Sequence, residues 1–284
     1  MRILAIVALL TLGASQAMAQ TKTCDALSQE KAKLAEALLA KIHPYDCCDD
    51  TIAGCLEAES PCSLVSRLAN DVCRHVAAGR EKDEIQQAMR RRAQSMMPTM
   101  NPASIDLNEA TRAGDEDAKV TLVMYACTTC PFCYAIASDL HELITDGSLS
   151  GKVKLYYRSF PLRAHEGSVE GGLALTAAAR LGKFWPVARL VYERVDDFST
   201  EAVVDWAESV GLDRDEFEEK MKDSATRESL GESRREGMRN GVDSTPTFFI
   251  NGRRYTYETT LEALEDVLLE EHERVTAAEG GSTD

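Results

Sequence analysis

The first third of the chain has apolar residues spaced for helices. Residues 28–42, 62–78 and 83–94 each carry an amphipathic pattern, with Ser28 suited to an N-cap and Gly79 to a stop signal. A short turn of helix is expected over 49–56. Two prolines within 97–102 interrupt the helical pattern on both sides. The pattern therefore predicts an all-helical N-terminal domain that ends near residue 98.

Downstream, the pattern changes to strands that alternate with helices. The run 120–125 is almost continuously apolar, which is typical of a strand buried on both faces. A helix is expected over 131–144, a second strand over 153–157 and a long helical stretch over 166–240. This order is typical of an α/β domain.

A hairpin and a helix complete that domain. The apolar run 247–250 and the segment 253–255 flank Asn251-Gly252, the dipeptide that favours a two-residue type I′ turn. A last helix follows, with its apolar face on Leu261, Leu264, Val267 and Leu268. We expect four segments in all, which are 1–19, 20–98, 99–275 and a flexible tail over 276–284.

The N-terminus has the pattern of a secretory signal peptide. Arg2 precedes an uncharged apolar run over 3–12, and small residues end in Ala17-Met18-Ala19. The run is well short of the roughly 20 residues that a helix needs to cross a bilayer. We therefore expect cleavage after Ala19 and a periplasmic or secreted protein.

The charge balance disfavours polyanionic partners. Lys and Arg number 32 against 47 Asp and Glu, so the formal net charge is −15. Nucleic acid and anionic membrane surfaces are poor partners for such a chain. The acidic balance otherwise reports solubility.

The candidate chemistry lies where the first buried strand meets its helix. Cys130 is placed at the helix N-terminus, Pro131 takes a first-turn position that needs no N–H, and Cys133 follows within the first turn. Unpaired backbone N–H groups and the helix dipole stabilise a thiolate there, so the pKa of Cys130 is expected to be low. Cys133 is placed to resolve a mixed disulfide. This redox-active disulfide needs no other cofactor.

A second feature lies more than a hundred residues away. Thr245-Pro246 directly precedes the strand 247–250. A cis peptide bond there lets the preceding residue pair with an extended peptide, whereas a trans proline at a strand start is the ordinary alternative. Together with the upstream cysteine pair, the cis form is favoured. The expected substrate-binding residues are Pro131, Phe132, Thr245 and Pro246.

Four segments between residues 103 and 275 resemble the DsbA-like thioredoxin-fold oxidoreductases. They are YACTTCPFCY at 125–134, YRSFPL at 157–162 followed by His165, GKFW at 182–185, and GVDSTPTFFING at 241–252. The resemblance implies a thioredoxin-like fold with a helical insertion over about 166–222. It also implies nucleophile, resolving and cis-proline roles for Cys130, Cys133 and Pro246.

Three positions depart from the most oxidising relatives. Those carry CPHC, whereas Phe132 offers neither charge nor hydrogen bond, so the disulfide is expected to be less oxidising. Thr245 resembles the isomerase and reductase relatives, where a hydroxyl lies near the sulfurs. Met124 stands where many relatives carry a buried acid. Proton transfer from the resolving cysteine is therefore expected to use water or another group.

A third cysteine extends the pair to C-x-x-C-x-x-C. A cluster or structural zinc needs a fourth ligand, and no cysteine follows Cys133, so no metal is expected. Cys127 is interpreted as a spare buried thiol or as the partner of an N-terminal cysteine. His165, at a family position, is expected to cap or brace the inserted helix.

Six cysteines precede residue 80 and allow fifteen pairings. They are Cys24, Cys47, Cys48, Cys55, Cys62 and Cys73. Cys62 and Cys73 are about 16 Å apart along one expected helix, so they cannot bond to each other, and adjacent Cys47 and Cys48 are expected to have different partners.

The segments 46–49 and 72–85 resemble the helical thiol domain of CcmH-type cytochrome c maturation proteins, without its cysteine spacing. A disulfide-stapled bundle that positions or dimerises the catalytic domain is favoured over a second redox centre.

The sequence thus predicts an exported thiol–disulfide oxidoreductase. Its partners are expected to be cysteine-containing protein substrates and a membrane or soluble redox partner protein. Oxidase, isomerase and reductase directions all stay open. The alternatives are a binding or chaperone module of the same fold without turnover, and a reductant in cytochrome c maturation.

Overall fold

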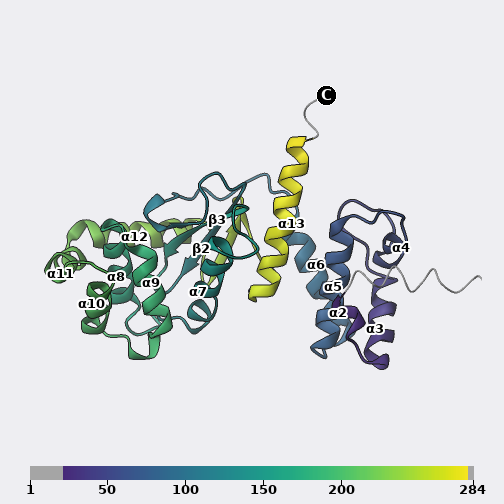
Figure 1. The fold of residues 1–284 in the computed structure, drawn as a ribbon, viewed down its shortest axis with the longest axis horizontal. Coiled ribbons are helices and arrows are strands. Elements are labelled where there is room, and N and C mark those ends of the chain that lie inside the picture. The colour runs from purple at the N-terminus through teal and green to yellow at the C-terminus, as the bar shows by residue number, and fades with distance from the viewer. Residues whose placement is uncertain (1–21, 281–284) are drawn as a thin grey trace, which may run out of the picture. The chain divides into compact units, whose positions relative to one another are not determined.

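The structure is a computed structural model that describes residues 22–280, so the expected signal peptide lies outside the described residues. The chain divides into two compact units, 1–94 and 95–284 (Figure 1). The division falls four residues before the boundary expected at 98. Within 22–280, no helix combines the length and the apolar character needed to cross a membrane.

The first unit is helical and has its own apolar core. Its elements are α2 (Lys22–Asp25), α3 (Gln29–Leu39), α4 (Ile52–Leu56), α5 (Ser63–Ala77) and α6 (Lys82–Met96). The end of α6 extends past the division at residue 94. Ser28 and Cys62 take the extended N-cap conformation before α3 and α5. Gly79 has a φ of +76° just after α5, which is the left-handed conformation that ends many helices. The helices expected from the sequence are confirmed.

Three disulfides connect these helices and loops. They are Cys24–Cys73, Cys47–Cys62 and Cys48–Cys55, so all six N-terminal cysteines are paired with one another. The adjacent Cys47 and Cys48 have different partners, as expected. Cys55 and Cys73 also belong to the buried core of this unit.

Arg92 differs from its two arginine neighbours. The triple arginine at 90–92 reads as a solvated helix face, and Arg90 and Arg91 are exposed, but Arg92 is fully buried. Its guanidinium donates a hydrogen bond to Asp71 at 2.7 Å. The helical period explains the difference, because position 92 continues the inward row of Ile85 and Met89.

The second unit contains a mixed five-stranded sheet of order β1-β3-β2-β4-β5. The strands are β1 (Arg112–Ala113), β2 (Val120–Ala126), β3 (Val153–Ser159), β4 (Thr247–Ile250) and β5 (Arg253–Arg254). β2 and β3 are parallel, and the other pairs are antiparallel. Asn251 and Gly252 both have positive φ, as a type I′ turn requires. The expected strands and hairpin are confirmed.

Helices make up most of the rest of this unit. They are α7 (Pro131–Thr145), α8 (Ser168–Arg180), α9 (Phe184–Glu193), α10 (Thr200–Ser209), α11 (Arg214–Lys222), α12 (Ser224–Arg239) and α13 (Leu261–Gly280), with short 3₁₀ turns at Glu109–Thr111 and Val195–Asp197. The helices α8–α11 form the insertion between β3 and α12 and cluster at one end of this unit (Figure 1). α13 continues to Gly280, so residues 276–280 of the expected tail are helical.

A buried polar network fixes α12 against the sheet. The Tyr125 hydroxyl donates to Glu236 at 2.7 Å, and Arg158 donates to the same carboxylate at 3.0 Å. Gly237 follows Glu236 and faces the rings of Phe160 and Tyr125. Since Tyr125 lies next to the end of β2, the strand that leads to the cysteine pair, this network also fixes the backbone that carries the site.

Candidate active site

Cys130 lies at the junction that the sequence indicates. It has extended backbone angles and is the N-cap of α7, with Pro131 in the first turn. The Cys130 N–H donates to the Cys127 carbonyl at 3.2 Å, and the Cys133 N–H donates to the Cys130 carbonyl at 3.0 Å. These local bonds place both sulfurs at the start of one helix. Both cysteines are free thiols in this structure.

The two thiols are shielded while the residues between them are not. Cys130 is 1% exposed and Cys133 is fully buried, whereas Phe132 is 72% exposed. Pro131 is also exposed. Phe132 and Pro131 are therefore accessible at the surface, whereas both sulfurs are shielded.

The surroundings shift the two pKa values in opposite directions. A hydrogen bond from the Cys133 thiol lowers the pKa of Cys130 to about 5, helped by the Thr245 side chain and by the backbone N–H groups of Cys133 and Phe132, although burial opposes the shift. Burial raises the pKa of Cys133 far above its ordinary value, and the neighbouring Cys130 raises it further. At neutral pH the reduced pair therefore holds one thiolate, on Cys130, and one thiol.

The Thr245-Pro246 peptide bond is cis, and it faces the nucleophile. Cys130 Sγ lies 3.4 Å from the Thr245 carbonyl oxygen. The Thr245 side chain is buried beside this sulfur and helps to lower the pKa of Cys130. Cys130, Cys133, Thr245 and Pro246 are thus brought together from segments more than a hundred residues apart.

Sequence reasoning missed the polar groups behind the cysteine pair. Met124, at the position of the relatives' buried acid, is fully buried. The Tyr157 hydroxyl instead lies 2.7 Å from the Tyr192 hydroxyl and donates to the Ala126 carbonyl at 3.3 Å. Burial raises the pKa of both tyrosines, so they stay neutral at physiological pH. Tyrosines at these positions carry no sequence signal that separates them from ordinary core aromatics.

Cys127 is a third buried thiol, and it contacts His165. Its Sγ lies 3.3 Å from His165 Nδ1. The expected alternative of a bond to an N-terminal cysteine was wrong, because those six cysteines are already paired. The His165 backbone carbonyl accepts a hydrogen bond from the Ser168 N–H at the start of α8. Within residues 22–280, no group of three His, Cys, Asp or Glu side chains could hold a metal.

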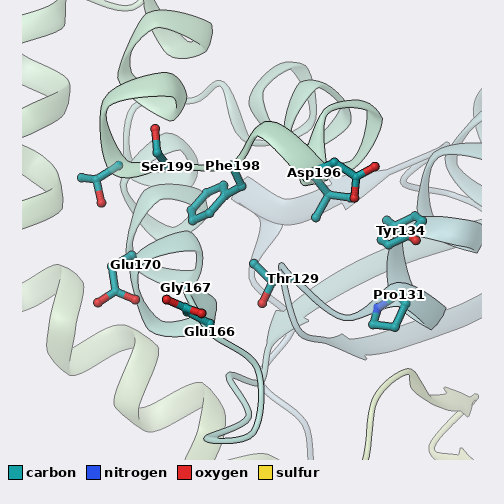
Figure 2. A pocket seen from close by; sticks show the side chains of 11 residues that line it. Thr129, Pro131, Tyr134, Glu166, Gly167, Glu170, Asp196, Phe198 and Ser199 are labelled. Atoms are coloured by element: carbon teal, nitrogen blue, oxygen red, sulfur yellow. The ribbon is translucent and has the colours of Figure 1, made fainter.

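A groove of about 650 Å³ is lined in part by Thr129 and Pro131, the residues on either side of Cys130 (Figure 2). It is lined by Thr129, Pro131, Tyr134, Glu166, Gly167, Glu170, Val195, Asp196, Phe198, Ser199 and Thr200. Three segments distant in sequence form it, which are the start of α7, the start of α8 and the connection between α9 and α10. Only their packing brings them together, so no local pattern could have indicated the groove.

The sheet with its helical insertion, and the buried cysteine pair beside a cis-proline, define a DsbA-like thioredoxin-fold protein. Comparison with known families agrees. Residues 107–270, more than half of the chain, match the family model described as thioredoxin, so the chain belongs to this family.

Solved structures share the fold. The thiol-disulfide exchange protein alpha-DsbA2 from Wolbachia pipientis is 23% identical, with a TM-score of 0.50 over 67% of this chain and 99% of that one. BdbD from Bacillus subtilis is 20% identical, with a TM-score of 0.50 over 61% of this chain and 100% of that one. At these identities the likeness concerns the fold alone.

Curated relatives are much longer proteins. The Na(+)/H(+) antiporter NhaA 3 of Salinispora tropica is 28% identical over 217 residues, which cover 76% of this chain and 32% of that protein. The antiporter NhaA 1 of Mycobacterium sp. (strain KMS) is 33% identical over 146 residues, or 50% of this chain and 23% of that protein. The chain thus spans a third or less of the length of these relatives.

Proposed function

We propose that this chain is an exported protein thiol–disulfide oxidoreductase with Cys130 as nucleophile and Cys133 as resolving cysteine. The opposite pKa shifts of two adjacent buried sulfurs carry this proposal. An attacking thiolate has to be ionised, and a resolving thiol has to stay protonated until the mixed disulfide forms. The cis Thr245-Pro246 bond beside Cys130 supports a place for an extended substrate segment.

The exchange runs in two steps. In the reducing direction the Cys130 thiolate attacks one sulfur of a substrate disulfide, forms a mixed disulfide, and the departing substrate sulfur takes up a proton. Cys133 then loses its proton and attacks the Cys130 sulfur, which releases the second substrate thiol. The substrate gains two electrons and two protons, and the enzyme pair becomes a disulfide. The oxidising direction is the reverse, and a membrane or soluble redox partner protein resets the pair.

Four residues are proposed to hold the substrate. The Thr245 backbone would pair with the substrate segment next to its cysteine, as an added strand does. Pro246 fixes the bend of that loop. Phe132 and Pro131 are exposed beside the sulfur and would contact apolar substrate side chains. No resident cofactor takes part in this scheme.

The nucleophile's pKa supports a reduction potential between the extremes of related enzymes. Thiolates with pKa values of about 3.5 and about 7 belong to redox pairs near −120 and −270 mV, respectively. The Cys130 pKa of about 5 lies between them. We therefore expect a potential between these limits, compatible with isomerase work. Equilibration of the full chain with glutathione buffers, followed by mass spectrometry of the peptide that holds Cys130 and Cys133, measures it.

The activity is tested by insulin reduction and by refolding of a protein with scrambled disulfides. We expect catalysis in at least one assay and its loss in Cys130→Ser. A binding or chaperone module without turnover would bind unfolded chains equally well after that substitution and be inactive in both assays. Trapping on Cys133→Ser identifies the protein partners, including any cytochrome c maturation protein.

Export is proposed on two grounds. Residues 1–19 have a signal-peptide pattern, and the three disulfides of the N-terminal unit require an oxidising compartment such as the periplasm. Fractionation and the intact mass of the isolated protein test this, because cleavage after Ala19 leaves Gln20 as the first residue. Size-exclusion chromatography with light scattering tests whether the N-terminal unit forms a homodimer.

A further inference from the structure

We infer that the groove beside Cys130 selects protein substrates that carry Lys or Arg close to the reacting cysteine. This inference rests on the proposed exchange activity and specifies the substrate class of that site. Three observations support it: the groove lies next to Cys130, its walls are acidic, and the aromatic side chain of Phe198 lines it.

The groove lies next to the nucleophile. Thr129 and Pro131, the residues on either side of Cys130, both line it, and Tyr134 lines it one turn further along α7. The opposite wall comes from the start of α8 and from residues 195–200 (Figure 2). A polypeptide joined to the Cys130 sulfur therefore places residues near its own cysteine in this groove.

The walls are acidic. Glu166, Glu170 and Asp196 all line the groove, and all three side chains are exposed. Among residues 22–280, no Lys, Arg or His forms an ion pair with any of them. Their charges are therefore available to a ligand. A cationic side chain gains from three carboxylates, whereas an acidic one is repelled.

An aromatic ring is fixed between these charges. Phe198 lies between the Glu170 and Asp196 sides of the groove (Figure 2). A Cβ atom at Gly167 would lie 3.1 Å from the Phe198 ring, and Gly167 also has a φ of +71°, which favours glycine. The ring is thus packed against the backbone at the start of α8. Lys and Arg suit this environment because their stems cover apolar surface while their charged ends reach carboxylates.

The test uses three peptides that each contain one cysteine activated as a mixed disulfide. They differ only at the positions two and three residues from the cysteine, which hold Lys, Ala or Glu. The rate of reaction with reduced full-length protein is measured at low and at high salt. We expect the Lys peptide to react about three- to tenfold faster than the Ala peptide at low salt, with the ratio falling at high salt.

Matched variants distinguish the effect of the groove carboxylates on the reaction rate from the effect of the protein's overall negative charge. The combined substitution Glu166→Gln, Glu170→Gln and Asp196→Asn should bring the Lys-to-Ala ratio close to one. The control Asp215→Asn, Glu219→Gln and Glu228→Gln removes the same charge from α11 and α12 and should keep the wild-type ratio. Equal ratios for the two triple variants, or no preference in the wild type, would overturn the inference.

The peptide reactions also distinguish a failure of the exchange function from a failure of the groove inference. If no peptide reacts with the wild type, the proposed exchange function fails; if all three react alike, that function stands and the groove inference fails. Circular dichroism checks the fold of each variant. Should the triple groove variant not fold, the single substitution Glu170→Lys replaces it. This variant should favour the Glu peptide, and an unchanged preference would overturn the inference.

Discussion

At the scale of single residues, two cysteines three positions apart have opposite acid–base behaviour. Both are buried, and burial alone would raise both pKa values. The difference is the hydrogen bonding, because Cys130 accepts from the Cys133 thiol and from backbone N–H groups at the start of α7. Cys133 is the donor, so its proton is retained.

The titration of Cys130 tests this account. Its lowered pKa means that the thiolate is present above about pH 5 and is lost as the pH falls through that value. Alkylation of the reduced protein should follow the same midpoint. Cys133→Ala removes the main hydrogen-bond donor and should raise the pKa of Cys130. Ultraviolet absorbance of the thiolate measures both, with Cys130→Ser as the blank, and an unchanged midpoint in Cys133→Ala would contradict the assigned cause.

Phe132 is expected to limit how oxidising the pair is. The side chain is exposed next to the nucleophile and offers no charge to its thiolate. Phe132→His supplies an imidazolium that stabilises the reduced form, so the reduction potential should rise by some tens of millivolts. Phe132→Leu is the control and should leave the potential near that of the wild type. Equal potentials in all three proteins would exclude this electrostatic role.

At the scale of elements, the close approach of α12 to the sheet depends on a missing side chain. A Cβ atom at Gly237 would lie 2.7 Å from the Phe160 ring and 3.0 Å from the Tyr125 ring. Both rings are fully or almost fully buried, so neither can move freely. The helix approaches the sheet here because position 237 has no side chain.

Two glycines of α12 give a matched pair of substitutions. Gly237→Ala should destabilise the protein by about 1–3 kcal/mol through overpacking. At Gly231 the nearest atom to an added Cβ belongs to the flexible Arg235 guanidinium, at 3.1 Å. Gly231→Ala should therefore stabilise by about 0.5–1 kcal/mol, the usual gain of alanine over glycine in a helix. Urea unfolding followed by the fluorescence of Trp185 and Trp206 measures both. Equal effects at the two positions would contradict the packing argument.

The elements that the sequence predicts are those with local signals. The apolar run of β2, the Pro131 position in α7 and the Asn251-Gly252 turn each depend on a few neighbouring residues. The acidic groove depends instead on how the α9–α10 connection packs against α8, and the burial of Arg92 depends on which face of α6 turns inward. Neither could be predicted without the tertiary structure.

At the scale of the whole molecule, each unit has its own means of stability. The N-terminal unit combines a helical core with three disulfides, while the redox pair belongs to the second unit, whose core contains the sheet. The pairing of the six N-terminal cysteines could not be predicted, because geometry removed only a few of the fifteen arrangements. Which sulfurs meet depends on how the helices and the loop that holds Cys47 and Cys48 pack together.

The disulfides should contribute unequally to the stability of the N-terminal unit. Cys24–Cys73 closes a loop of 49 residues, whereas Cys48–Cys55 closes one of 7. In the chain-entropy description, the longer loop restricts the unfolded chain more, by about 2 kcal/mol. Replacing Cys24 and Cys73 by alanine should therefore lower the free energy of unfolding more than replacing Cys48 and Cys55.

Hydrogen exchange measured by mass spectrometry reports this ranking directly. Peptides from α3 and α5 give the free energy of opening in the N-terminal unit, and peptides from β2 and α13 give a reference from the other unit. Each double substitution should increase exchange in the first set and leave the second set near the wild-type level. The reverse order of the two variants would mean that the short disulfide stabilises the native state through local packing near the buried Cys55, and that loop entropy is the smaller effect.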